Sequence, residues 1–368
     1  MTITTRTTTA SAPDVARELS PGECSVETVV DSAAHAEWAR YVEHSPHASV
    51  FHHPCWSDAV CAAFGHRPHH YLARCDERIV GVLPLVEVRS RLAGRLLISV
   101  PYGNYGGIVA DSAAAIEALA ATAAELAVKC GARVLELRSA AAQVPDFEPI
   151  EGYVGFVRDL PLHPNEMDTF LPRKARAAAR HARERDGLVI QHDAALAPVV
   201  WQLYCRSMRR LASINYPYRL FAELFERMGE RAWATVAWQG ERPIAGTISL
   251  VFRDTVMPYI VGTDERVRSE GATNLLYWAV AERAVRSGLR RFDFGRSRAD
   301  NHGSVSFKKN QGFEPRPLGY QRYVPPGRTP ANLKPSNPRF ALARRVWPRL
   351  PLPMTRALGA CLARWIPG

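Results

Sequence analysis

The sequence predicts an α/β protein in which one domain occurs twice. Residues 70–88 resemble residues 233–252, and Gly81 and Gly246 stand at the same place in the two segments. Residues 131–137 align with 288–294 in the same way. The two offsets, 165 and 157 residues, are nearly equal. Solenoid repeats have periods of only ~20–50 residues, so a repeat of this length indicates two globular domains.

The first copy begins with two predicted helices, one over residues 33–44 and one that follows a turn within 51–65. A hairpin is predicted over 71–92, because β-rich runs flank the polar turn Asp76-Glu77-Arg78. Residues 95–111 predict a strand broken by a Gly-rich loop. The Ala- and Leu-rich run 113–129 predicts a helix that ends at Gly131, and 132–139 predicts a strand. This order is typical of an α/β domain.

The second copy is predicted after residues 156–162, which begin the link. Helices are predicted over 172–187, 196–211, 218–228 and 275–287, and a hairpin over 233–252. Strands are predicted over 255–261, 291–294 and 318–324, with a loop between the last two. The chain is therefore divided into a disordered leader over 1–24, a first domain over 25–165, a second domain over 166–325, and a Pro-rich basic tail over 326–368.

The net charge of +11 comes almost entirely from the tail. No acidic residue follows Glu314, whereas the last 54 residues hold ten basic ones. Residues 1–314 carry 37 basic and 36 acidic groups, so the body of the chain is nearly neutral. This distribution predicts a basic tail that meets an anionic surface.

The cysteines favour a cytoplasmic protein. All seven are scattered and form no CxxC pair, as expected of reduced thiols. The polar, Thr-rich N-terminus lacks the apolar core of a secretory signal, and no apolar run approaches the ~18 residues of a spanning helix. Seven histidines lie between His44 and His70, but their spacing matches no zinc framework, so no metal is expected.

Segment 293–309 gathers most of the groups that could do chemistry, namely Asp293, Arg296, Ser297, His302 and Lys308. It follows a predicted strand, and ligands of open α/β sheets lie beyond the carboxyl ends of strands. A Lys or Arg there can stabilise a developing oxyanion or bind a phosphate. The alternative is a solvated loop with ordinary charges.

The turn before residue 275 is a weaker candidate. Arg268 precedes Gly271 and Asn274, and backbone N–H groups at a helix N-terminus can bind a pyrophosphate. The alternative is a plain Gly-containing loop capped by Thr273 or Asn274.

Residues 100–109 hold Tyr102, Asn104 and Tyr105 among three glycines. Glycines let a backbone approach a ligand closely, and the polar side chains can orient it. The alternative is a tight turn whose tyrosines fill surface gaps.

Helix 172–187 is strongly basic and carries Lys174 next to Arg173 and Arg176. With Arg180 and Arg183, the two arginines form one face that could hold a nucleotide diphosphate or an RNA backbone. The alternative is a solvated basic helix.

The end of the tail has helical periodicity. One apolar face contains Met354, Leu358, Cys361, Leu362, Trp365 and Ile366. Such a helix lies on an anionic membrane or docks onto the body of the protein.

Taken together, these residues resemble the FemAB-like branch of the GNAT superfamily, over roughly residues 45–325. The motifs that carry the resemblance are 51–56 (FHHPCW), 81–85 (GVLPL), 101–107 (PYGNYGG), Lys174-x-Arg176, Asn274-x-x-Tyr277-Trp278, 294–297 (FGRS) and Phe307-Lys308. Several match the subgroup associated with exopolysaccharide synthesis and the PEP-CTERM protein-sorting system. The chain departs from classical Fem enzymes in lacking a long helical arm between Gly187 and Trp233, and its pyrophosphate loop is degenerate.

The resemblance implies two tandem GNAT domains, each a mixed sheet with flanking helices. In Fem enzymes the lysine that matches Lys308 lies at the acyl-transfer centre, so the same role is implied here. Fem enzymes that build peptidoglycan bridges transfer an amino acid from aminoacyl-tRNA to an amine of a UDP-linked muropeptide. Their relatives transfer acyl groups from thioesters to other amines.

We therefore expect an N-acyltransferase that acts on an amine of a cell-envelope or exopolysaccharide precursor. It would work in the cytoplasm, peripheral on the inner face of the membrane through its tail. The donor would be aminoacyl-tRNA, acyl-CoA or acyl carrier protein, with no tightly bound cofactor. The alternatives are a CoA- or carrier-protein-dependent enzyme acting on a small amine, and a non-catalytic scaffold of polysaccharide synthesis.

In this scheme Lys308 stabilises the oxyanion, and Asp293, His302 or a relayed water accepts the amine proton. The expected donor-binding residues are Arg268, Gly271, Asn274, Arg296 and Ser297. The expected acceptor-binding residues are Tyr102, Asn104, Tyr105, Lys174 and Arg176.

Overall fold

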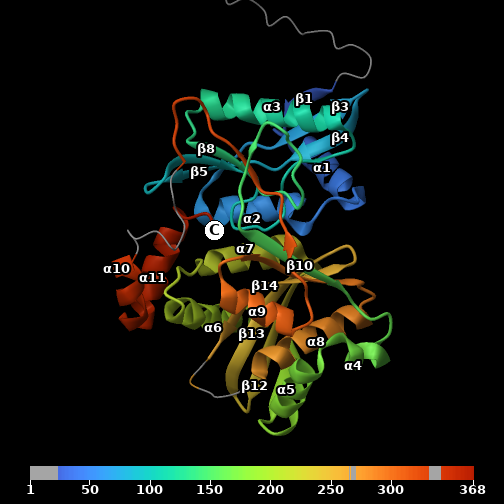
Figure 1. Cartoon of the computed structure of the whole chain (residues 1–368), viewed down its shortest axis with the longest axis vertical. Helices are drawn as coiled ribbons and strands as arrows, with labels where there is room; N and C mark the ends of the chain where they lie inside the picture. Colours follow the sequence, from blue (N-terminus) through green and yellow to red (C-terminus); the bar gives the residue numbers. More distant parts are fainter. Residues whose placement is uncertain (1–23, 265, 267–270, 331–340) are drawn as a thin grey trace, which may run out of the picture.

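The computed structural model describes residues 24–264, 266, 271–330 and 341–368. The predicted leader, apart from Cys24, and Arg268 lie outside the described residues. Figure 1 shows two α/β bodies stacked along the long axis of the molecule, with the C-terminal helices beside the junction. The mixed α/β architecture and the duplication predicted from the repeat are confirmed.

The first half contains the following elements: β1 (Ser25–Thr28), α1 (Ser32–His44), η1 (Val50–His52), α2 (Pro54–Phe64), β2 (Arg67–Pro68), β3 (Tyr71–Cys75), β4 (Arg78–Leu83), β5 (Val86–Ser90), β6 (Gly94–Ile98), β7 (Val109–Ala110), α3 (Ala113–Lys129), β8 (Val134–Leu137), β9 (Glu148–Pro149) and β10 (Tyr153–Asp159). The hairpin of β3 and β4 turns at Asp76 and Glu77, both with positive φ, as in the primed turns that suit twisted hairpins.

The second half contains η2 (Pro164–Glu166), α4 (Met167–Phe170), α5 (Arg173–Glu184), β11 (Leu188–His192), η3 (Ala194–Leu196), α6 (Ala197–Arg210), α7 (Tyr218–Met228), η4 (Gly229–Arg231), β12 (Ala232–Gln239), β13 (Arg242–Phe252), β14 (Thr255–Thr263), α8 (Ala272–Arg286), β15 (Arg291–Arg298), α9 (His302–Asn310), β16 (Arg316–Pro317) and β17 (Gln321–Tyr323). The tail contributes α10 (Ala341–Val346), η6 (Trp347–Arg349) and α11 (Leu352–Ala363).

The repeat detected in the sequence corresponds to equivalent elements. The hairpin β3–β4 matches β12–β13, and α3 followed by β8 matches α8 followed by β15. Gly131 and Gly288 both have positive φ after these helices, at +67° and +78°. A left-handed residue is what ends each helix and turns the chain into the next strand.

Two predicted elements differ in the structure. The loop expected after residue 294 is instead the second half of β15 followed by the short helix α9, which Asn301 caps by accepting a hydrogen bond from the Ser304 amide. The strand expected over 318–324 is shortened to β17. The polar composition of residues 298–310 favoured a loop, but the packing of Phe307 and Lys308 stabilises a helix there.

Strand pairing crosses the midpoint of the chain. The second-half sheet has the order β11-β12-β13-β14-β15-β10-β16, so it includes β10 from before residue 165. The first-half sheets have the orders β1-β3-β4-β7 and β2-β5-β6-β8-β17-β9, so β17 belongs to the first body. The predicted boundary between 165 and 166 lies between β10 and α4, and the strand hydrogen bonds do not follow it.

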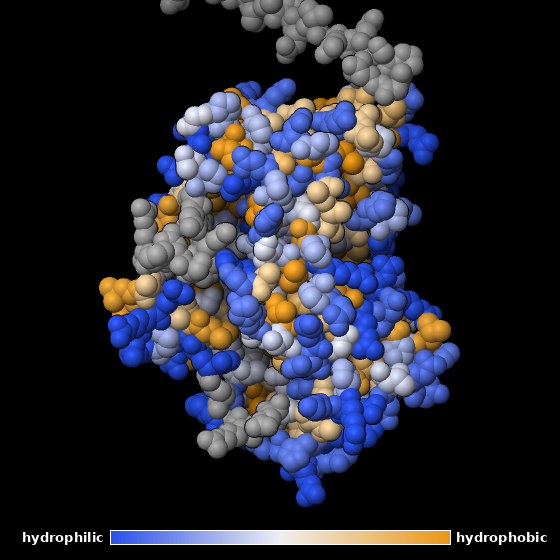
Figure 2. Space-filling view, in the orientation of Figure 1, coloured by the Kyte–Doolittle hydropathy of each residue, from blue (hydrophilic) through white to orange (hydrophobic). Residues whose placement is uncertain are grey.

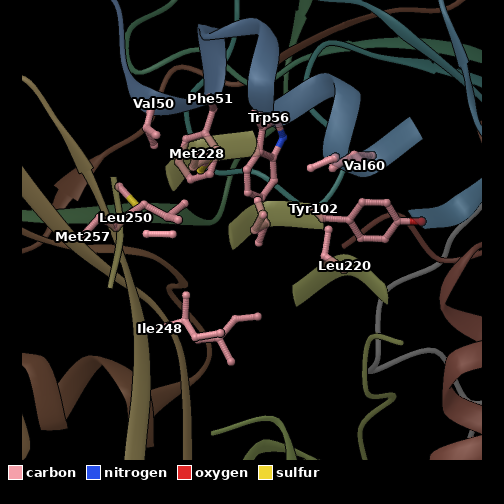
Figure 3. Close-up of a cluster of buried hydrophobic side chains, with 14 of the residues drawn as sticks. Val50, Phe51, Trp56, Val60, Tyr102, Leu220, Met228, Ile248, Leu250 and Met257 are labelled. Atoms are coloured by element: carbon pink, nitrogen blue, oxygen red, sulfur yellow. The ribbon is translucent and has the colours of Figure 1, made fainter. Parts of the chain in front are cut away.

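A hydrophobic core joins the two bodies. Figure 3 shows Phe51 and Trp56 of the first half packed over Leu220 and Met228 of the second, with Ile248 of β13 below them. Phe51 and Trp56 are fully buried. The packing of α2 against α7 therefore fixes the two bodies relative to each other.

Strands β14 and β15 separate soon after they begin. They run parallel and pair only at Thr255 with Arg291 and at Val256 with Phe292. Beyond these residues both strands continue, β14 to Thr263 and β15 to Arg298, without pairing to each other. The carboxyl-terminal part of this sheet thus leaves a gap, which is where α/β sheets place ligands.

Candidate active site

A kink in β15 is held by Lys308. Gly295 takes a positive φ of +64° within the strand. The Lys308 ammonium, on α9, donates to the carbonyls of Phe294 at 2.8 Å, Gly295 at 3.4 Å and Arg296 at 3.1 Å. It also lies 4.8 Å from the centre of the Phe156 ring. Lys308 therefore stabilises the turned backbone of β15.

Burial also changes the acidity of Lys308. The side chain is buried, and desolvation lowers its pKa to about 8, because an uncharged amine is less costly to bury than an ammonium ion. The lysine remains able to carry a positive charge near neutral pH. A charge held inside the kink is suited to stabilising negative charge that develops nearby.

Asp293 precedes the kink and is buried between the two bodies. Its carboxylate accepts hydrogen bonds from the Gly295 amide at 2.6 Å and from the Tyr105 hydroxyl at 3.2 Å. Burial raises the pKa of Asp293 to about 7, and those hydrogen bonds oppose the rise. A carboxyl group with this pKa can accept and release a proton at neutral pH, as a general base must.

The first body inserts a loop, residues 100–107, into the gap between β14 and β15; we call it the wedge loop. The Asn104 amide lies 3.6 Å from the Met257 sulfur on β14, and the Tyr259 hydroxyl on the same strand donates to the Tyr102 carbonyl at 2.9 Å. On the other side, Tyr105 contacts Asp293 on β15. The wedge loop thus contacts both strands beyond the point where they separate.

Arg296 supplies a second cation beside the wedge loop. Its guanidinium lies 5.0 Å from the centre of the Tyr153 ring and 5.7 Å from that of Tyr320. The Tyr320 hydroxyl in turn donates to the Asn104 carbonyl. Arg296 is only partly buried, so its charge can meet an anionic group.

Residues 363–368, here called the terminal segment, lie against the same loop. The Tyr102 hydroxyl donates to the Ala363 carbonyl at 3.0 Å, and the Tyr102 amide to the Pro367 carbonyl at 2.9 Å. The buried Arg138 donates to the carbonyls of Pro367 at 3.1 Å and Gly368 at 2.8 Å. A Cβ at Gly368 would lie 3.6 Å from the Arg296 guanidinium. The terminal segment therefore lies against the wedge loop and close to Arg296.

The glycine at the N-terminus of α8 has a packing role. A Cβ at Gly271 would lie only 1.9 Å from the Ala178 carbonyl of α5, so this glycine permits close contact between two helices. Asn274, in the first turn of α8, is buried. Helix α5 packs its small residues Ala175, Ala179 and Ala182 on this region.

The basic helix α5 presents its other face to solvent. Lys174 is exposed, and Arg176 donates to the Asp168 carbonyl. Arg180 forms a two-point pair with the Asp168 carboxylate at 2.8 and 2.9 Å. Figure 1 shows α5 at the end of the second body that faces away from the first.

The structure brings together only some of the predicted residues. Five of them lie at or next to the wedge loop: Asp293, Lys308, Arg296, Asn104 and Tyr105. The main chain of Tyr102 lies there as well. Ser297 lies near them but bonds to Ser304 of α9 at 2.8 Å. His302 is exposed on the first turn of α9. Among the described contacts, none links His302, Gly271, Asn274, Lys174 or Arg176 to Asp293.

The Tyr102 side chain is placed differently from the expected acceptor contact. It is buried, stacks on Phe64 at 4.1 Å between ring centres, and its hydroxyl also lies 2.9 Å from His66. The Tyr102 side chain therefore anchors the wedge loop. Its backbone has a positive φ of 65°, which is unusual for a tyrosine.

Sequence reasoning missed Arg138 and Tyr320. Arg138 follows β8 at the position that aligns with Gly295 in the repeat, so the repeat gave no signal for its contacts. Tyr320 follows β16 in a segment with no detectable motif.

Comparison with known proteins agrees with this architecture. No curated protein matches the sequence. Residues 171–309 match the family model described as an acetyltransferase (GNAT) domain. The second body is a GNAT acyltransferase domain.

Solved structures extend the likeness to both bodies. FemX has 14% sequence identity and a TM-score of 0.64, over 81% of this chain and 97% of its own. A tandem GNAT protein from the clavulanic acid biosynthesis pathway, solved without AcCoA, has 18% identity and a TM-score of 0.52, over 83% of this chain and 100% of its own. The fold is therefore two GNAT-like domains in tandem, and the match to the GNAT family model lies in the second of them.

No helix among the described residues is both long enough and apolar enough to cross a membrane.

Proposed function

We propose that this GNAT protein transfers an acyl or aminoacyl group to an amine of a cell-envelope or exopolysaccharide precursor, with Asp293 as the general base. The observation that carries the proposal is the position of Asp293. It is a buried carboxyl with a pKa of about 7, at the gap between β14 and β15, bonded to Tyr105 of the other body.

The reaction would proceed by direct attack of a neutral amine on the carbonyl carbon of an ester or thioester. A C–N bond forms, and the C–O or C–S bond to the donor breaks. Asp293 accepts the proton that the amine loses and returns it to the departing oxygen or sulfur. The Lys308 charge and the backbone of the kink would stabilise the oxyanion. Arg296 would bind an anionic part of a substrate.

Two observations favour aminoacyl-tRNA over a CoA or carrier-protein thioester as donor. The exposed cations of α5, including Lys174, suit a polyanionic backbone. The close contact of Gly271 with Ala178 gives this glycine a packing role that needs no bound pyrophosphate. His302 and a relayed water remain weaker candidates for the base, because His302 is exposed and contacts no other described site residue.

The likeness to FemX and the basic tail support the proposed acceptor class. An amine-bearing envelope or polysaccharide precursor would be met in the cytoplasm, at the inner face of the membrane. In this proposal Tyr105, Asn104 and Arg296 would contact such an acceptor beside Asp293.

The test is a donor-binding comparison on the full chain. A thermal-shift titration would use CoA, acetyl-CoA and longer acyl-CoAs, and fluorescence anisotropy would use mixed tRNA. A ligand at 100 times its Kd stabilises by about 2.7 kcal/mol, which is easily detected. We expect tRNA binding that weakens in Lys174→Gln/Arg183→Gln, with Glu226→Gln as the control. Saturable stabilisation by acyl-CoA would transfer the assignment to a thioester donor, and no response to either class would contradict the proposed function.

A further inference from the structure

Helices α10 and α11 expose more apolar side chains than their docking requires. Leu342 and Val346 lie one helical turn apart on α10, and Met354 and Leu358 on α11, with 43–73% of each side chain exposed. We call these four residues the tail patch. Eleven large apolar side chains are exposed in the described ranges, and four belong to these two short helices. The concentration indicates a surface with a function.

The opposite face of α11 already provides the docking contacts. Thr355, Gly359 and Ala363 are buried. A Cβ at Gly359 would lie 2.2 Å from the Asn215 side chain, so the helix sits close against the loop after α6. Arg356 also stacks over the Trp201 ring at 5.1 Å. Because the helix is held without them, Met354 and Leu358 are available to another partner.

Exposed arginines surround the tail patch. Arg344, Arg345 and Arg349 are all exposed on α10 and η6. No acidic residue follows Glu314 in the sequence, so the tail offers them no carboxylate. Figure 2 shows hydrophobic and hydrophilic side chains next to each other over these helices. The surface therefore offers aliphatic side chains that can enter an apolar phase, next to cations that attract negative charge.

We propose that α10 and α11 form a docking surface for an anionic lipid bilayer. Aliphatic side chains beside arginines suit the boundary between headgroups and acyl chains. An RNA partner would use the arginines but leave the aliphatic side chains in water. A second copy of the chain, related by a two-fold axis, would bring like charges together. The inference does not depend on the identity of the donor.

The test is flotation of the full chain with vesicles. One set would contain phosphatidylcholine alone and the other an equal part of phosphatidylglycerol. The apolar variant is Leu342→Ser/Val346→Ser/Met354→Ser/Leu358→Ser, and the charge variant is Arg344→Gln/Arg345→Gln/Arg349→Gln. Val128→Ser/Val189→Ser, at exposed positions on α3 and β11, is the matched control. All substituted side chains are exposed, so the variants should fold.

Binding is expected only to the phosphatidylglycerol vesicles. The charge variant should bind more weakly, by roughly fivefold for each arginine, and wild-type binding should fall with salt as the Debye length shortens. The apolar variant should lose at least about tenfold, and the control should bind like wild type. Absence of wild-type binding, or equal binding by the apolar variant, would overturn the proposal. So would a dimer in sedimentation velocity that the apolar variant dissociates, since the tail patch would then be a self-association surface.

Discussion

The Tyr105 hydroxyl lies 3.2 Å from the Asp293 carboxylate, so a loop of the first body directly contacts the candidate base of the second. The same carboxylate accepts the Gly295 amide within its own strand. The environment of Asp293 is therefore completed only when the two bodies are packed together.

Replacing Tyr105 by Phe should raise the pKa of Asp293. The hydroxyl donates to the charged carboxylate and so lowers the pKa of Asp293. Burial raises this pKa, and without the hydroxyl that effect is less opposed. The pH profile of transfer should move to higher pH, with a loss of up to about tenfold at pH 7. Titration of the Asp293 carboxyl carbon by NMR measures the shift without any substrate. Tyr204→Phe, which removes another buried hydroxyl, is the control and should leave Asp293 unchanged.

Replacing Asp293 by Asn should stabilise the protein at pH 8. The folded pKa of about 7 lies above the usual 3.8, so the folded state binds the proton more tightly than the unfolded state. Wild-type stability should therefore fall as pH rises from about 4 to 7. Asn does not ionise, so the variant should not lose this stability.

Urea unfolding at pH 5 and pH 8 measures this difference. From pH 5 to pH 8, the free energy of unfolding of the variant should rise relative to that of wild type by about 2 to 4 kcal/mol. The variant should also lose transfer activity. An equal pH dependence in both proteins would show that Asp293 titrates normally.

Replacing Lys308 by Met should slow transfer by about a hundredfold or more, because the charge within the kink is lost. Methionine keeps most of the side-chain volume but leaves the carbonyls of Phe294, Gly295 and Arg296 without their donor. Lys309→Met, at the exposed neighbouring position, is the matched control. Activity and circular dichroism would be measured on both. Full turnover by Lys308→Met would remove Lys308 from the mechanism.

Replacing Arg138 by Gln should release the terminal segment. Arg138 donates to the carbonyls of Pro367 and Gly368, and the Tyr102 amide is bonded to Pro367. Hydrogen exchange of the Tyr102 amide should accelerate by about tenfold or more as this contact opens. Arg133→Gln, at an exposed position in the same half, should leave the rate unchanged. Unchanged exchange in Arg138→Gln would mean that other contacts hold the segment.

Replacing Gly271 by Ala should destabilise the protein by about 2 to 4 kcal/mol, because the new Cβ would overlap the Ala178 backbone. Gly303→Ala is the control. Its Cβ would meet nothing closer than 3.8 Å, and it should change stability by less than about 0.5 kcal/mol. Thermal unfolding compares the two. A silent Gly271→Ala would show that the contact between α5 and α8 adjusts to an added methyl group.

The fold could be predicted from the sequence because duplication leaves a pattern. Gly131 and Gly288 each end a helix before a strand, and Gly81 and Gly246 mark equivalent hairpins. The pairing of β10 with the second-half sheet and of β17 with a first-half sheet could not be predicted. The sequence of a strand indicates which face is buried but not which strand it pairs with.

The candidate site was predictable only in part. Asp293 and Lys308 lie within one segment, so their proximity followed from spacing. The contact of Tyr105 with Asp293 spans 188 positions and depends on how the bodies pack. The packing of Gly271 against α5 was hidden for the same reason, because a glycine that serves a close helix contact has the same sequence signature as one that serves a ligand.

The strand exchange has a consequence for how the protein is made. The first body cannot complete its six-stranded sheet until β17, at residues 321–323, has left the ribosome, although its other strands all precede residue 150 in the chain. The sheet of the second body holds β10, which is synthesised before every other strand of that sheet. The first body must therefore wait for a strand made after the second body, and the edge of β8 stays open to wrong pairing until the chain is nearly finished.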